Sequence, residues 1–160
     1  MSTVQSMQNI TAALLDTLFN PPLCVAYAST VQSIPNTTWT SILLNNNRID
    51  SYTGHSTSVN TSRYTSALTG WYEVHGNIPL NVAHAPSGRL AVNGAVVLGS
   101  QTPGSVSTSG TGGVQPQFRV LLNAGDYVEI QVFQSSGGAV NTFANGVDWG
   151  PAMDLHLIHR

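Results

Sequence analysis

The chain has 160 residues, the size of a single domain that can bury a hydrophobic core. Only 8% of its residues are charged, against ~25% in typical globular proteins, so its surface must consist mainly of Ser, Thr, Asn and Gln. All five basic residues are arginines, which excludes a phosphate-loop lysine, a Schiff-base lysine and a polybasic membrane patch. The net charge of −2 offers no electrostatic footprint for nucleic acid. This composition is typical of exposed, often oligomeric β-rich proteins.

Two further classes are disfavoured by the sequence. No apolar run approaches the ~20 residues that a membrane-spanning helix needs. The first residues lack a charged segment followed by an apolar one, so we expect no signal peptide. Cys24 is alone and cannot form an intramolecular disulfide, and its apolar neighbours Leu23 and Val25 predict a buried strand thiol.

Residues 1–22 are predicted to form an arm with a short helix, which ends at Asn20-Pro21-Pro22. A helix of two to three turns is marginal alone in water, so its apolar face must pack on something. Either the helix covers the open end of its own β domain, or it anchors the chain to a sister subunit or a larger assembly. The anchoring side chains would be Ile10, Leu14, Leu18 and Phe19.

Residues 23–160 are predicted to form one β domain of short strands separated by turns. Between Gly70 and Leu80 the residues alternate, which predicts Tyr72 and Val74 on one face and Trp71, Glu73 and His75 on the other. Asn93-Gly94 between apolar residues is a strong hairpin signal. The chain closes with an alternating strand that contains Met153, Leu155 and Leu157.

Residues 118–133 alternate on both sides of Gly125-Asp126, which predicts an antiparallel hairpin. The Gly- and Ser-rich residues 99–117 are predicted to be a mobile surface loop, because no Gly-Lys-Ser/Thr follows the glycines. Roughly eight to ten short strands with frequent turns predict an all-β, jelly-roll β-sandwich. No fixed-period repeat is visible, which disfavours a propeller or a solenoid.

Three stretches, residues 25–40, 63–72 and 122–132, together with the lead-in at residues 10–13 and 20–22, carry a family resemblance. The chain resembles a module of bacteriophage virion proteins that is similar to the globular head of complement and to the tumour-necrosis-factor fold. The resemblance implies a jelly roll of about ten strands that forms a trimer, with aromatic and aliphatic side chains along the three-fold axis. The chain departs from the pattern in the two histidines of its closing strand and in lacking a coiled-coil shaft.

The residue types that carry chemistry show no catalytic pattern. His156 and His159 are three apart, which predicts opposite faces of a strand and argues against joint metal ligation. His75 shares a predicted face with Glu73, and the pair could hold a metal or a proton, although surface polarity explains it as well. A ring of symmetry-related histidines at a trimer axis stays open. The seven acidic residues are dispersed and form no calcium loop, so no metal, no cofactor and no catalytic site is predicted.

Taken with these observations, the resemblance implies a non-enzymatic bacteriophage virion protein: a homotrimeric capsid decoration protein on the particle surface, with the major capsid protein as its partner. The alternative is a tail-associated adhesion module for host attachment, such as a minor tail protein, that recognises a bacterial surface glycan. Trp149, Tyr52 and the Gly-rich residues 104–113 would then be its contacts, although Trp149 could instead pack under the turn at residues 148–151. A secreted binding domain is disfavoured by the missing signal peptide, and a glycan hydrolase by the lack of a visible acid pair.

Overall fold

The computed structural model describes residue 15 and residues 19–82, 84–106, 110–144 and 149–160. The elements that these residues form are all strands. The predicted arm helix falls mostly outside them: Ile10, Leu14 and Leu18 are not among the described residues, and Phe19 is largely exposed. The division into an arm and a β domain therefore stays a prediction, and the first strand begins at Leu23.

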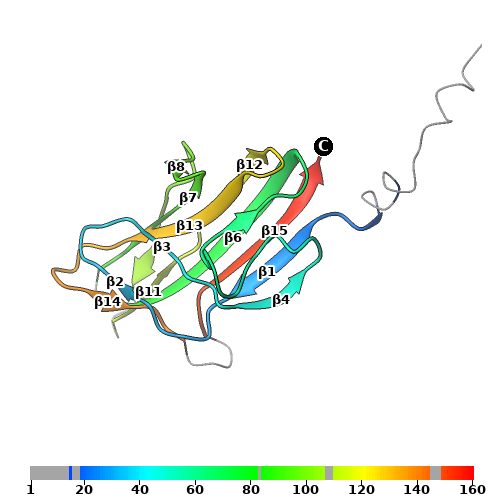
Figure 1. Ribbon diagram of the computed structural model, residues 1–160. Helices are drawn as coiled ribbons and strands as arrows, with labels where there is room; N and C mark the ends of the chain where they lie inside the picture. Colours follow the sequence, from blue (N-terminus) through cyan, green and yellow to red (C-terminus); the bar gives the residue numbers. More distant parts are fainter. Residues whose placement is uncertain (1–14, 16–18, 83, 107–109, 145–148) are drawn as a thin grey trace, which may run out of the picture.

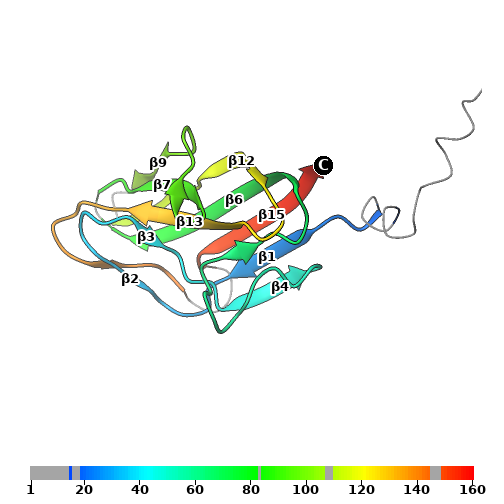
Figure 2. The same ribbon diagram turned by 45° about the horizontal axis from the view of Figure 1, so that its top comes forward.

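The larger of the two main sheets has seven antiparallel strands (Figures 1 and 2), with β6, β15, β1 and β4 side by side in this order. On the opposite edge of β6, β12 pairs with its first half and β11 with its last residues, and β10 pairs with β11. The strands are β1 (Leu23–Tyr27), β4 (Asn46–Asp50), β6 (Gly70–Asn81), β10 (Ser105–Val106), β11 (Thr111–Val114), β12 (Gln117–Leu122) and β15 (Ala152–His159).

The smaller sheet has six strands and is centred on the antiparallel pair of β13 and β7. Its strands are β3 (Thr40–Ser41), β5 (Tyr64–Thr65), β7 (Ser87–Val92), β8 (Ala95–Val96), β9 (Thr102–Pro103) and β13 (Tyr127–Phe133). A separate two-stranded ladder joins β2 (Ser33–Ile34) to β14 (Val140–Asn141). The described residues thus form fifteen strands, more than predicted, because several are only two residues long.

The core lies between the two main sheets and is built by alternation along the long strands. On β6, Tyr72 and Val74 are fully buried, while Trp71 is exposed, as the sequence predicts. The predicted alternating strand at the end of the chain is β15, and its Met153, Leu155 and Leu157 are buried. Cys24 is fully buried in β1, also as predicted, and burial together with nearby Asp50 and Asp154 raises the pKa of its thiol to about 12.

The predicted hairpin at residues 118–133 is wrong in its pairing, although both strands exist. β12 pairs with β6 in the larger sheet, whereas β13 pairs with β7, β3 and β5 in the smaller one. The turn at Gly125 is held by the loop before β6, because the Gly125 amide donates to the Ser66 carbonyl oxygen at 2.8 Å. Alternation specifies which side of a strand is apolar but not which strand lies beside it. The turn therefore crosses between sheets.

The hairpin predicted at Asn93-Gly94 is confirmed. Val92 pairs with Ala95 across a two-residue turn. The φ angles of Asn93 and Gly94 are 51° and 79°, the left-handed values that a type I′ turn requires.

The mobile surface loop predicted for residues 99–117 is wrong for much of its length, since β9, β10 and β11 run through it. Gly112 pairs with Leu80 and Gly113 with Pro79 on β6. A Cβ atom built on Gly104 would lie 2.5 Å from the Gly113 carbonyl oxygen. The glycines that suggested a loop thus allow close backbone packing at a sheet edge.

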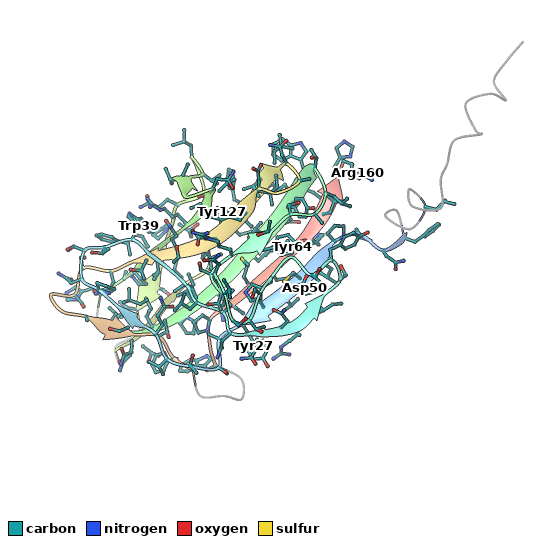
Figure 3. All side chains as sticks on the ribbon, viewed as in Figure 1. Tyr27, Trp39, Asp50, Tyr64, Tyr127 and Arg160 are labelled. Atoms are coloured by element: carbon teal, nitrogen blue, oxygen red, sulfur yellow. The ribbon has the colours of Figure 1, made fainter. Side chains whose placement is uncertain are left out.

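Two tyrosines of the core differ in how their hydroxyl groups are satisfied. Tyr64 and Tyr72 lie ring to ring with centroids 6.2 Å apart, and Figure 3 places Tyr64 in the middle of the domain. The Tyr72 hydroxyl donates to the Leu68 carbonyl oxygen at 2.9 Å and lies 2.8 Å from the Ser66 hydroxyl. The Tyr64 hydroxyl has no hydrogen-bond partner among the residues that the structure describes. Burial raises the pKa of both tyrosines.

We therefore expect opposite effects from one chemical change. Tyr72→Phe should lower the free energy of unfolding by about 1 kcal/mol, because it removes a buried hydrogen bond. Tyr64→Phe should leave it unchanged or raise it, because it removes a buried polar group without a partner. Urea unfolding at one fixed protein concentration measures both. Equal destabilisation by the two variants would contradict the assignment.

Candidate functional site: the outer face of the larger sheet

The outer face of the larger sheet is the side that carries the residues alternating with the core. On β6 these are Trp71, Glu73, His75 and Asn77. The pairing register sets Leu121, Arg119 and Gln117 of β12 opposite the first three. Asp154 and His156 of β15 lie opposite His75 and Glu73 on the other side. Residues from β12, β6 and β15 therefore form continuous cross-strand rows on one face.

One end of this face is apolar. Trp71 lies directly opposite Leu121, whose exposed fraction is 51%, and Trp71 is also exposed. Ile158 is exposed on β15, next to His159, which pairs with Trp71. Ile49 of β4 is also exposed, but it pairs with Val25 in the row of Asp154 and His75 and so lies away from this end. Contiguous exposed apolar side chains such as Trp71 and Leu121 mark interaction surfaces.

At the centre of the face, the Glu73 carboxylate lies among three potentially cationic groups. Glu73 Oε1 lies 3.7 Å from Arg119 Nε and 3.8 Å from His75 Nε2, and Glu73 Oε2 lies 3.9 Å from His156 Nε2. At these separations the contacts are ion pairs without close hydrogen-bond geometry. Among the described residues no group of three or more His, Cys, Asp or Glu side chains is arranged to hold a metal ion.

The prediction that His156 and His159 lie on opposite faces is wrong. The register between β15 and β6 shifts between Leu157 and His159, so that His156 lies opposite Glu73 and His159 opposite Trp71. Both partners are outer-face residues, and directly opposite residues share a face. The extra residue of a β-bulge, which the strand pattern does not reveal, changes the alternation.

The outer side of the smaller sheet differs, because its charged side chains are packed against their own chain. The buried Glu129 carboxylate accepts from the Ser62 hydroxyl at 2.6 Å and from Arg63 Nε at 3.2 Å. The Arg63 guanidinium lies 4.1 Å from the centre of the Tyr127 ring. Figure 3 shows Tyr127 and Trp39 in this region, where the Arg89 guanidinium lies 4.0 Å from the centre of the Trp39 ring. These cation–π pairs stabilise the fold.

Of the predicted contacts, Trp149 lines one pocket with residues 104–106 and 111–113 of the Gly-rich stretch, whereas Tyr52 lies elsewhere. The Tyr52 hydroxyl donates to the Asn20 carbonyl oxygen at 3.1 Å, so it ties the base of the arm to the turn after β4. The Trp149 ring packs on Phe143 with centroids 4.9 Å apart, yet 49% of the residue is exposed. Trp149 is therefore both packed against its own chain and half-exposed to solvent. Tyr52 and Trp149 do not come together in one site, and the outward apolar Leu121, visible in the alternation, was not singled out from the sequence.

No known protein-family model matches the sequence, and no curated protein matches it. Solved structures do resemble it. The globular domain of zebrafish complement 1qA protein superposes with a TM-score of 0.63 at 16% identity, covering 88% of this chain and 99% of that one. The Eiger TNF of S. frugiperda gives 0.55 at 16% identity, covering 87% and 95%. The vertex protein P5 of PRD1 gives 0.62 at 14% identity, covering 87% and 98%.

These similarities show the fold: an all-β jelly roll of the complement-head and TNF type, as predicted from the sequence. Within the described part of the chain, no helix is long and apolar enough to cross a membrane.

The Arg63–Glu129 pair lies on the smaller sheet and the Arg119–Glu73 pair on the larger one. Matched alanine variants test which of these pairs stabilises the single chain. The Arg63 side chain is 37% exposed and its partner Glu129 is buried, whereas the Arg119 side chain is 67% exposed. We expect Arg63→Ala to lower the free energy of unfolding by about 1–3 kcal/mol, because it leaves a buried carboxylate without its cation. Arg119→Ala should cost less than about 1 kcal/mol, as exposed ion pairs do.

Thermal or urea unfolding under conditions in which the chain is monomeric gives both values. A loss from Arg119→Ala as large as that from Arg63→Ala would show that the Glu73 cluster supports the fold itself.

Proposed function

We propose that the protein is a non-enzymatic virion structural protein that forms a homotrimer and decorates the outside of a bacteriophage capsid. The observation that carries this proposal is the outer face of the larger sheet, where an exposed Trp71–Leu121 pair adjoins the Glu73 cluster. The similarity of the fold to the vertex protein P5 of PRD1 supports the choice of a virion.

The composition of this face suits a permanent contact between copies. Aromatic side chains and arginines are enriched in the centres of protein interfaces, and the face offers Trp71 and Arg119. Glu73 lies beside each of the potentially cationic side chains of the cluster. Two copies that meet at this face therefore do not bring uncompensated positive charges together. A closed cyclic trimer would use the face in every subunit.

The arm is the part proposed to hold the trimer on the capsid. It enters the domain beside the same face, because the Leu157 amide donates to the Pro22 carbonyl oxygen at 3.0 Å and Leu23 pairs with His156. The bond from Tyr52 to Asn20 fixes its base, and Phe19 is exposed next to that point. The anchoring residues of this proposal are Ile10, Leu14, Leu18 and Phe19, with the major capsid protein as partner.

The alternative, a tail adhesion module that binds a bacterial surface glycan, uses the same trimer in another place on the virion. The observation that favours it is the half-exposed ring of Trp149. A head decoration needs the arm for attachment to the particle, whereas glycan binding by an adhesin does not.

The trimer is tested by a charge placed in its proposed interface. Leu121→Asp should abolish the trimer, because a desolvated carboxylate would face apolar side chains. Leu98→Asp is the matched control, since Leu98 is also exposed but follows β8 of the smaller sheet. Sedimentation equilibrium should give three times the chain mass of 16.9 kDa for the wild type and for Leu98→Asp. A wild-type monomer, or a trimer of Leu121→Asp, would contradict the proposed interface.

The decoration role is tested on particles. Antibody labelling of virions from the phage that encodes the chain should cover the head in electron micrographs. Chains lacking residues 1–22 should still form trimers but fail to bind capsids stripped of the protein. Label confined to the tail tip would favour the adhesin. Capsid binding by the truncated trimer would refute the anchoring role of the arm.

A further inference from the structure

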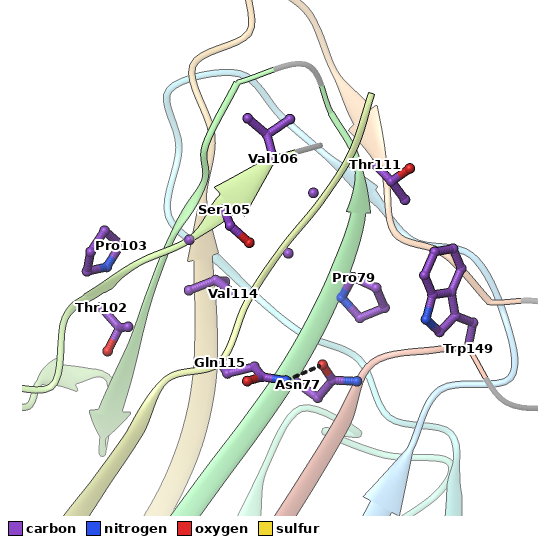
Figure 4. Close-up of a pocket in the computed structure, with 13 residues that line it drawn as sticks. Asn77, Pro79, Thr102, Pro103, Ser105, Val106, Thr111, Val114, Gln115 and Trp149 are labelled. Atoms are coloured by element: carbon purple, nitrogen blue, oxygen red, sulfur yellow. Dashed lines mark hydrogen bonds between the residues drawn. The ribbon is translucent and has the colours of Figure 1, made fainter. Parts of the chain in front are cut away.

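A pocket of about 810 Å³ lies at the end of the larger sheet where β6 finishes. Figure 4 shows Trp149 on one side of it and Thr102 and Pro103 on the other, with β10 and β11 between them. Its volume is within the ~300–1,000 Å³ that is usual for small-molecule sites. The site belongs to neither the apolar end of the outer face nor the arm.

The polar groups that line the pocket are neutral in the part of the chain that the structure describes. None of these described lining residues is Asp, Glu, Lys, Arg or His. Two amides form its floor, where Gln115 Nε2 donates to Asn77 Oδ1 at 3.4 Å (Figure 4). This contact engages neither the Gln115 carbonyl oxygen nor the Asn77 amide nitrogen, which are the groups proposed to meet a ligand. Hydroxyl groups of Thr102, Ser105 and Thr111 complete the set.

The aromatic wall is held in position by the fold. The Trp149 ring packs on Phe143 at an interplanar angle of 36°, which restricts its orientation, while about half of the residue remains exposed. Pro79 and Val106 add apolar surface beside it. An aromatic ring combined with a few fixed neutral hydrogen-bonding groups is the usual make-up of a specific small-ligand site.

We propose that this pocket binds a neutral saccharide. A pyranose ring has an apolar face of C–H groups, which fits the Trp149 ring, and a rim of hydroxyl groups, which fits the amides of Asn77 and Gln115. A phosphate or a sialic acid is a poor fit, because its charge would be desolvated without a cationic side chain among the described lining residues. This binding activity goes beyond the proposed decoration role and deepens the alternative adhesion role, for which it names the site and the class of glycan; it is compatible with a head or a tail position.

The pocket and the proposed trimer contact lie on the same strand but apart. Asn77 is six positions after Trp71 on β6, a separation of about 20 Å at ~3.3 Å per residue. Saccharide binding and trimer formation can therefore be changed independently, and the variants below should keep the mass of the wild-type assembly.

The test uses the full-length protein and a panel of neutral hexasaccharides of glucose, mannose, galactose and N-acetylglucosamine, screened by saturation-transfer NMR at about 1 mM and quantified by calorimetry. At least one should bind. Trp149→Ala should weaken its binding about tenfold or more, and Gln115→Ala several-fold. Trp149→Phe should retain part of the affinity because it keeps a ring. Leu98→Ala, on the smaller sheet, is the control and should bind as the wild type does.

Thermal unfolding and sedimentation of each variant show whether the fold and the assembly are kept. The proposal is overturned if no member of the panel binds, or if folded Trp149→Ala and Gln115→Ala bind as tightly as the wild type. Binding by the Leu121→Asp variant but not by the wild-type assembly would also overturn it, because a neighbouring copy would then occupy the pocket. Loss of the trimer with retained saccharide binding would instead refute only the proposed structural role.

Discussion

The burial of alternate β6 residues against the smaller sheet is the constraint on which the rest of the structure depends. Tyr72 and Val74 are fully buried in the core, and the strand pairs on both of its edges. Because side chains of a strand alternate between its faces, this burial commits Trp71, Glu73 and Asn77 to the outside. Each proposed surface includes part of that outward set: Trp71 and Glu73 belong to the trimer contact, and Asn77 belongs to the saccharide pocket.

The scarcity of charge makes the position of each charged group informative. Glu129 is buried and satisfied by Ser62 and Arg63 of its own chain, so it serves the fold. Glu73 is more exposed and lies at ion-pair distances from His75 of its own strand and from Arg119 and His156 of the two neighbouring strands. A group of this kind adds little to the stability of a single chain, but it can define how two copies fit together.

Sequence reasoning was most successful where one local rule decides the outcome. The left-handed turn at Asn93-Gly94 and the burial of Cys24 follow from local residue types, and both are confirmed. It failed for the strands around Gly125, whose turn crosses between sheets, and for the glycines at 112–113, which pair with β6. Trp149 was named as a contact, but the chain gives no signal that its ring would meet Asn77 and Gln115 in one pocket.

The sequence by itself determined the all-β class, the inward and outward faces of the long strands and the likeness to a complement-head and TNF-type jelly roll. Only the tertiary structure decided which strands are neighbours, and so which outward residues form a surface. The register shift near His159 and the pairing of Trp71 with Leu121 are of this kind. The physical reason is that alternation is a property of each strand alone, whereas pairing depends on contacts between residues far apart in the chain.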